Sequence, residues 1–599
     1  MSRPTPQRPS ADAEPLDAPG VDAPGVDAPA ADDPTSDLVA DDVRAGAANR
    51  DGVGGSPTGG SGRSIVRSSA IFAGLTLVSR LLGFVRDLVV TAFMGASAGV
   101  AADAWQTALA FPNLFRRIFA EGAFAAAFVP AYSRSLARDG EEVADVLAAD
   151  AMATLAAATI VIALAAELTM PWLMYLINPG YAHDPAKFKL AVLLTQITMP
   201  YLPCMAIYAH LSGVLNARGR FVLSALAPAL LNIGTLITIL PQHTPRGAAI
   251  AAAVGAVGAG VAQAALLWWG VRRSGARVDV RLPRLTPEIK ALIALAIPGA
   301  LAASATQINI FFSGFMASLV DGARAWLAVA DRLYQLPYGM IGVAIGVTLL
   351  PRLSSAVHQG DERGAQAAMD QAVAISMALT LPAAAALAAM PFFLIDGLFT
   401  RGLFHVYDAQ ATAKALFFYG LGTPAFILNR VLAPAFYARQ DTRSPMRFAL
   451  ISVAVNLVCG GLFFVVLHAV DHGPGAGFQG IAAATALASW INVAQMARVL
   501  ARRGFYRPSP VELARLVKIV AASVALGLFL ALASARRAHY QDLFLRKEGA
   551  LVAVVALGVA LYFGLLFALQ AVSPAELRGV LRRGPKAAGG AGPELAPEI

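Results

Sequence analysis

Ionisable side chains occur inside some of the most apolar stretches of this sequence. The segment SRLLGFVRDLVV carries Arg80, Arg86 and Asp87. Two other segments carry further charges of this kind: Arg116, Arg117 and Glu121 in FPNLFRRIFAEGAF, and Asp331 and Arg332 in DRLYQLP. An ionised group inside hydrocarbon is costly, so it usually faces a cavity or a partner of opposite charge. In a helix Asp87 would follow Arg80 by about two turns and share nearly the same face.

Four arginines are predicted to line a cavity, because they outnumber the acids close enough to pair with them: Arg80, Arg86, Arg116 and Arg332. Buried cations without carboxylate partners favour an anion. Arginine suits a phosphate better than lysine does, because its planar guanidinium donates two parallel hydrogen bonds to the oxygens. The predicted ligand is therefore an anion, with a diphosphate as the natural candidate.

Several of these charges also have a purely structural explanation. Arg117 and Glu121 stand four residues apart, which is the spacing of an ordinary ion pair on one helix. Asp331 could neutralise Arg332, and Asp103, close to a predicted helix start, could be an N-terminal cap. A supporting or coupling role is assigned to five residues: Asp87, Asp103, Arg117, Glu121 and Asp331.

Motifs of enzymes do not survive inspection. The string GASAG at residues 95–99 matches a nucleophile elbow, but it falls in a short turn between helices and not in a strand-to-helix bend. The sequence contains no Gly-Lys dipeptide and hence no P-loop, and its eight histidines lack metal-binding spacing. Cys204 and Cys459 lie in separate apolar stretches and are interpreted as core residues. We expect no enzyme activity, no metal and no cofactor.

Composition assigns the chain to the membrane class. Hydrophobic residues make up 57% of it, charged residues 14%, and the mean hydropathy is +0.60. Apolar stretches long enough to cross about 30 Å of hydrocarbon recur along the chain. We predict an all-α protein with fourteen spans, near residues 65–94, 103–133, 145–177, 187–215, 221–241, 248–271, 288–318, 325–350, 366–398, 408–437, 446–468, 477–500, 511–534 and 549–571.

The distribution of charge predicts the orientation. Loops after even-numbered spans, with the C-terminal tail, hold twenty-three arginines and lysines, whereas loops after odd-numbered spans hold about ten. By the positive-inside rule both termini are cytoplasmic. This role for the basic loops also argues against nucleic-acid binding. Residues 1–62 carry a net charge of −7 and too little apolar surface to fold, so we expect a disordered extension without a cleaved signal peptide.

An internal repeat appears when the chain is compared with itself at a shift of 221 residues. Trp105 then falls on Trp326, and Pro203 falls on Pro424. Matches of such residues indicate two copies of a six-helix unit, and an even number of helices makes the copies parallel. The predicted divisions are an extension (1–62), an N-lobe (63–286), a C-lobe (287–505), two additional helices (506–575) and a cytoplasmic tail (576–599). The substrate site would lie in a central cavity between the lobes.

Long, ordered segments of the chain closely resemble one known family. SRLLGFVRD, FPNLFRRIFAEGAFAAAFVP, DRLYQLPYGMIGVAIGVTLLPRLS and LAPAFYARQDTRSP are similar to the MurJ (MviN) family of bacterial lipid II flippases. The resemblance extends over residues 65 to about 575. It implies the fold of the multidrug/oligosaccharidyl-lipid/polysaccharide exporter superfamily, with a central cavity between two lobes.

The resemblance also implies roles for particular residues. The family's cavity arginines match the four arginines named above, and its functional acids match Asp87, Asp103 and Glu121. Its last two helices form a groove for the lipid tail, a role that 506–575 would then have. Many relatives carry an acid three residues after Arg332, where this chain has Gln335, so a coupling role of that carboxylate is in doubt here.

We therefore expect a lipid II flippase of the bacterial inner membrane that works by alternating access. The expected partners are lipid II, through its undecaprenyl diphosphate head and prenyl tail, membrane lipids, and the cell-wall synthesis machinery. Three alternatives remain open: a flippase for another undecaprenyl-linked glycan, a cation-coupled multidrug exporter, and a membrane scaffold. The membrane potential and an ion gradient are equally compatible driving forces.

Overall fold

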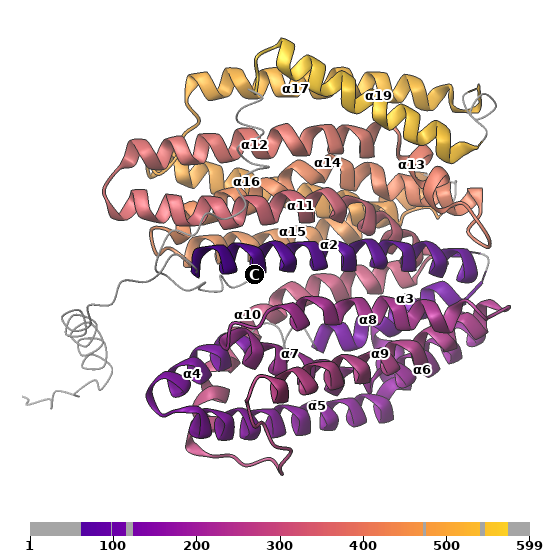
Figure 1. Ribbon diagram of the computed structural model, residues 1–599. Coiled ribbons are helices and arrows are strands. Elements are labelled where there is room, and N and C mark those ends of the chain that lie inside the picture. Colours follow the sequence, from indigo (N-terminus) through magenta and orange to yellow (C-terminus); the bar gives the residue numbers. More distant parts are fainter. Residues whose placement is uncertain (1–60, 98, 116–123, 471–474, 540–545, 573–599) are drawn as a thin grey trace, which may run out of the picture. The chain divides into compact units, whose positions relative to one another are not determined.

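The computed structural model describes residues 61–97, 99–115, 124–470, 475–539 and 546–572, and these include no strand (Figure 1). Met1–Ser61 and Gly62–Ile599 are separate units. The helices are α2 (Ser61–Met94), α3 (Ala101–Phe115), α4 (Phe124–Arg138), α5 (Glu141–Ile177), η2 (Pro179–His183), α6 (Pro185–Thr198), α7 (Tyr201–Ala217), α8 (Val222–Ile239), α9 (Pro245–Arg273), α10 (Pro287–Ser318), α11 (Ala323–His358), α12 (Glu362–Ala389), α13 (Pro391–Phe399), α14 (Val406–Tyr437), α15 (Arg443–Val470), α16 (Gln479–Arg502), α17 (Pro510–Ala535) and α19 (Lys547–Ala568).

Each predicted span corresponds to one helix or to a consecutive pair. The pairs are α3 with α4, α6 with α7, and α12 with α13. Ten helical segments of the described chain are long and apolar enough to cross a membrane, which confirms a multi-pass helical protein. The expected disorder of residues 1–62 and the tail 576–599 lie outside the described residues, except for the first residues of α2.

Helix boundaries follow the repeat seen in the sequence. Glu141 and Glu362 begin α5 and α12, and these two starts are 221 residues apart. The same spacing separates the starts of α6 and α14, and those of α8 and α15. The copies differ in where a helix is interrupted, since the first is broken at Met199 and Pro200 between α6 and α7, whereas α14 continues through the equivalent positions. A proline removes a backbone donor, which explains the break.

Hydrophobic cores distinguish the two ends of the helices. We call the end where α2 stops and α3 begins the Met94 end, and the opposite end the Arg138 end. At the Met94 end one core joins both repeats, with Trp105 and Tyr181 from the first and Trp326 and Phe478 from the second. At the Arg138 end the described residues form two separate cores, one around Phe128 and one around Phe436. The repeats are thus packed together at one end only.

The last two helices pack on the second repeat. Leu526 of α17 and Tyr562 of α19 share a core with Phe393 of α13. The Tyr562 hydroxyl donates to the backbone carbonyl of Ala378 in α12, at 2.7 Å. These two helices therefore extend the second repeat, as the sequence predicted for helices outside the duplication.

Candidate functional site

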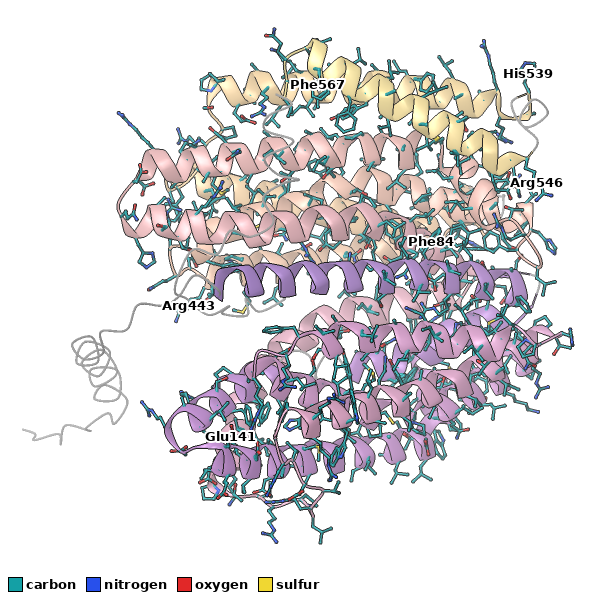
Figure 2. All side chains as sticks on the ribbon, in the orientation of Figure 1. Phe84, Glu141, Arg443, His539, Arg546 and Phe567 are labelled. Carbon is teal, nitrogen blue, oxygen red and sulfur yellow. The ribbon has the colours of Figure 1, made fainter. Side chains whose placement is uncertain are left out.

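Helix α2 runs between the helices of the two repeats (Figure 1) and contacts both. Asn232 of α8 donates from its side-chain amide to the backbone carbonyl of Ser79, at 3.0 Å. On the side of the second repeat, the ring of Phe84 meets that of Phe399 edge to face at 5.8 Å (Figure 2). The backbone N–H of Leu403 donates to the carbonyl of Ala92. The charged residues of α2 are thereby held at the junction of the repeats.

Asp87 of α2 binds two arginines, one from each repeat. Arg86 donates to its Oδ1 from Nε and Nη2, at 3.0 and 2.7 Å. Arg332 of α11 places its Nε 2.8 Å from the other oxygen. The three side chains are 17 to 26% exposed. This group, which we call the Asp87 cluster, keeps one unit of positive charge and some access to solvent, as an anion site requires.

A glycine makes room for the arginine that crosses between the repeats. Gly83 is buried on α2, and a Cβ placed there would collide with Nη2 of Arg332. Sequence analysis did not single out Gly83, although a glycine inside a long apolar helix often marks a close approach. Asp331 was weighed as the partner of Arg332, but in the structure Gln335 donates to Asp331 while Arg332 pairs with Asp87.

The other predicted cavity residues divide into two groups. Arg80 lies on α2 toward the Arg138 end and is exposed. Arg116, Arg117 and Glu121 fall within 116–123, outside the described residues. The structure therefore brings together Arg86, Asp87 and Arg332 and leaves the remaining cavity assignments as predictions.

One further cation was missed. Arg430 of α14 donates from Nε to the Tyr338 hydroxyl of α11 at 2.6 Å, and its guanidinium lies 4.4 Å from the centre of that ring. The side chain of Arg430 is exposed. A charge inside an apolar stretch was the signal that identified Arg86, and the stretch FILNRVLAPAF carries the same signal.

Asp103 closes the Met94 end by bridging the repeats. It is 1% exposed, and its carboxylate accepts hydrogen bonds from the backbone N–H groups of Gly322 and Ala325, at 2.8 and 3.0 Å. Lys187 of α6, itself 3% exposed, donates to the same carboxylate at 2.6 Å. Asp103 was considered as a cap of its own helix, but here it satisfies the N-terminus of α11 instead.

Asp408 forms a second bridge at this end. This fully buried carboxylate accepts from the N–H and the hydroxyl of Ser97, at 2.9 and 2.5 Å, and from the indole N–H of Trp326 at 2.9 Å. Ser97 belongs to the turn before α3, so α14 is tied to the first repeat. Sequence analysis identified neither Asp408 nor Lys187. We call Asp103, Lys187, Asp408 and Ser97, with their partners, the closure contacts.

The closure contacts carry opposite charges at equivalent positions of the repeats. Lys187 and Asp408 are 221 residues apart, as are Asp103 and Arg324. Arg324 donates to the Asn178 side chain across the repeats at 2.5 Å. Duplication alone would place like charges opposite one another at the pseudosymmetric junction. The exchange of sign makes the two surfaces complementary and stabilises their contact.

Comparison with known proteins identifies the family. The family model described as "Lipid II flippase MurJ" matches residues 90–549. The chain belongs to the MurJ family. It is 38% identical over 539 residues to the probable lipid II flippase MurJ of Rhizobium meliloti (strain 1021), an alignment that covers 88% of this chain and 97% of the relative. It is 32% identical over 521 residues to the lipid II flippase MurJ of Burkholderia cenocepacia, covering 84% and 98%.

Solved structures show that the fold is shared. A lipid II flippase MurJ in the inward closed conformation aligns with a TM-score of 0.66 and 23% identity, over 83% of this chain and 98% of its own. An inward-facing multidrug resistance transporter of the MATE family aligns with a TM-score of 0.56 and 15% identity, over 73% and 98%. The predicted MurJ family and superfamily fold are confirmed. The family is one of transporters, in agreement with the prediction that the chain is not an enzyme.

Proposed function

We propose that the protein moves lipid II across the bacterial inner membrane by alternating access, with the Asp87 cluster as the site that meets the diphosphate. The observation that carries this proposal is a net positive cluster, partly open to solvent, shared between two repeats that are packed together at one end only. Membership of the MurJ family supports lipid II as the substrate.

The chemistry of the cluster fits a guest with several negative charges. Asp87 holds Arg86 and Arg332 side by side, so that their guanidinium groups are positioned before the ligand arrives. A diphosphate oxygen competes with the carboxylate for the same donors, and each guanidinium can present two parallel N–H groups to it. Replacing the water around the diphosphate with these donors lowers the barrier that hydrocarbon presents to a charged headgroup.

The direction of transport follows from which end is closed. The closure contacts bury Asp103 and Asp408 at the Met94 end, whereas the repeats have separate cores at the Arg138 end. The positive-inside rule places the Arg138 end in the cytoplasm. Lipid II would therefore reach the cluster from the cytoplasmic leaflet, and breaking the closure contacts while the Arg138 end closes would release it to the opposite leaflet.

The prenyl tail has an apolar surface to follow. The outer faces of α17 and α19 expose Leu528 and Leu532, and Val552 and Leu557, each by more than 60%. Because these side chains already face lipid, a tail beside them loses no apolar contact while the headgroup moves. We therefore assign the tail to this face of α17 and α19.

Labelling from outside the cell tests the proposed direction. A cysteine at His243, in the exposed turn before α9 at the Met94 end, should react with an impermeant thiol reagent in intact cells. A cysteine at Asp279, in the exposed loop before α10, should react only after the membrane is permeabilised. Both belong in a background with Cys204 and Cys459 replaced by alanine. The reverse pattern would place the closed end in the cytoplasm and overturn the proposed route.

A further inference from the structure

A groove on the outer side of the second repeat is unrelated to the Asp87 cluster. It has a volume of about 660 Å³, within the range of small-molecule sites, and lies between α13, α14 and the adjoining ends of α15 and α16. Its walls are mainly apolar, with one ammonium group among them. The residues that matter here are Phe392, Gln410, Lys414, Phe417, Phe418 and Leu467.

The groove faces lipid in a single leaflet. Phe417 and the following Leu421 are 39% and 48% exposed on α14, a segment apolar enough to cross a membrane. Trp490 of α16 lies on the same surface and donates to the carbonyl of Leu421 at 3.0 Å. Gln410 and Phe418 are four and twelve residues into α14, so the groove runs about 6 to 18 Å from its start. That depth extends from a headgroup layer into the acyl chains.

Two cations flank this apolar groove. Lys414 lines its wall, and the guanidinium of Arg537, just past the end of α17, lies 4.5 Å from the ring centre of the lining residue Phe392. The neighbouring acids are engaged elsewhere: Asp396 lies 3.4 Å from Lys547, and Glu548 lies 3.4 Å from Arg401. The groove therefore combines a greasy wall with a positive rim, which complements a lipid whose headgroup is an anion.

We propose that this groove binds an anionic glycerophospholipid of the phosphatidylglycerol class. Its phosphodiester would lie between Lys414 and Arg537, and an acyl chain would pack against Phe417 and Phe418. Assignment to the outer leaflet rests on the proposed orientation of the Met94 end. Binding itself depends neither on lipid II transport nor on that orientation.

The test is lipid binding by the purified full-length chain in detergent. Phosphatidylglycerol and zwitterionic phosphatidylcholine with identical acyl chains are titrated, and bound lipid is counted by native mass spectrometry. Phosphatidylglycerol should be preferred. Lys414→Gln and Arg537→Gln should each weaken its binding about fivefold, and the double variant about 25-fold. Arg536→Gln removes a charge from the exposed residue next to Arg537 and should bind as the wild type does.

Several results would overturn the proposal. Equal binding of the two lipids would exclude recognition of the anionic headgroup, and a double variant that binds like Arg536→Gln would exclude the two cations. Displacement of the lipid by inorganic phosphate alone would make this a site for free phosphate. Loss of binding by every variant, Arg536→Gln included, would exclude a local site. A transport-inactive Arg86→Ala variant should retain the lipid preference, which separates this proposal from the proposed function.

Discussion

Replacing Asp103 by asparagine should open the Met94 end to reagents from outside. The substitution keeps the shape of the side chain but removes the charge that Lys187 contacts and weakens acceptance from the N-terminus of α11. Removing one partner of a buried ion pair costs roughly 3 to 5 kcal/mol. This cost falls on the closed state, in which the pair exists. The conformational equilibrium should therefore shift by at least about a hundredfold, provided that the pair breaks when the end opens.

A buried cysteine can report this change. Ser318 is 2% exposed at the Met94 end, and Ser318→Cys in a background free of other cysteines should be labelled slowly by an impermeant reagent. Adding Asp103→Asn should raise the labelling rate at least tenfold. Asp184→Asn is the matched control, because Asp184 caps only α6, through the N–H groups of Ala186 and Lys187. Equal rates in both variants, at normal membrane abundance, would show that Asp103 does not hold the end closed.

Loss of the guanidinium groups of the Asp87 cluster should abolish transport without preventing membrane insertion. The cluster carries one net positive charge, so Arg86→Ala or Arg332→Ala makes it neutral, and the double variant leaves the Asp87 carboxylate alone to repel a diphosphate. A hydrogen bond to a charged group contributes about 1.5 to 3 kcal/mol. Each single variant should therefore bind about 10- to 100-fold more weakly, and the double variant should not transport.

Arg86→Lys separates recognition of a diphosphate from simple charge pairing. Lysine can still neutralise Asp87, but it lacks the planar fork that presents two parallel N–H groups to phosphate oxygens. A merely structural Arg86 should be replaceable by lysine, whereas the proposed site predicts a loss close to that of Arg86→Ala. Arg134→Ala removes an exposed arginine of α4 and should transport normally. Full activity of Arg86→Lys would return Arg86 to the role of a counter-ion.

Local patterns were sufficient for the helices and for their duplication. Hydropathy identifies a stretch such as α15, and coincident Trp and Pro residues identify a repeat whose helix starts the structure reproduces at the same spacing. These features depend on near neighbours in the chain or on the comparison of one copy with the other. The predicted charged residues of α2 were likewise recognisable, because an arginine inside hydrocarbon is conspicuous wherever its partner lies.

Partners distant in the sequence could not be found in this way. Asp103 looks like a cap of its own helix, and nothing within a few residues shows that it binds Gly322 and Ala325 of α11 instead. Lys187 resembles a lysine at a membrane interface, and only the packed structure shows its ammonium buried against Asp103. Arg332 has Asp331 beside it in sequence but pairs with Asp87 in space. Each case depends on which helices meet, and the order of residues does not determine that.

Lipid II appearing in the outer leaflet measures the central claim most directly. Cells depleted of their own flippase should be supplied with the wild-type chain or with the Arg86→Ala and Arg332→Ala double variant, each at equal membrane abundance. Surface-accessible lipid II is then quantified with an impermeant reagent. The wild type should restore outer-leaflet lipid II, and the double variant should leave it in the inner leaflet. Restoration by the double variant would contradict the Asp87 cluster as the transport site, and failure of the wild type, with another lipid-linked glycan accumulating in its own depleted host, would contradict lipid II as the substrate.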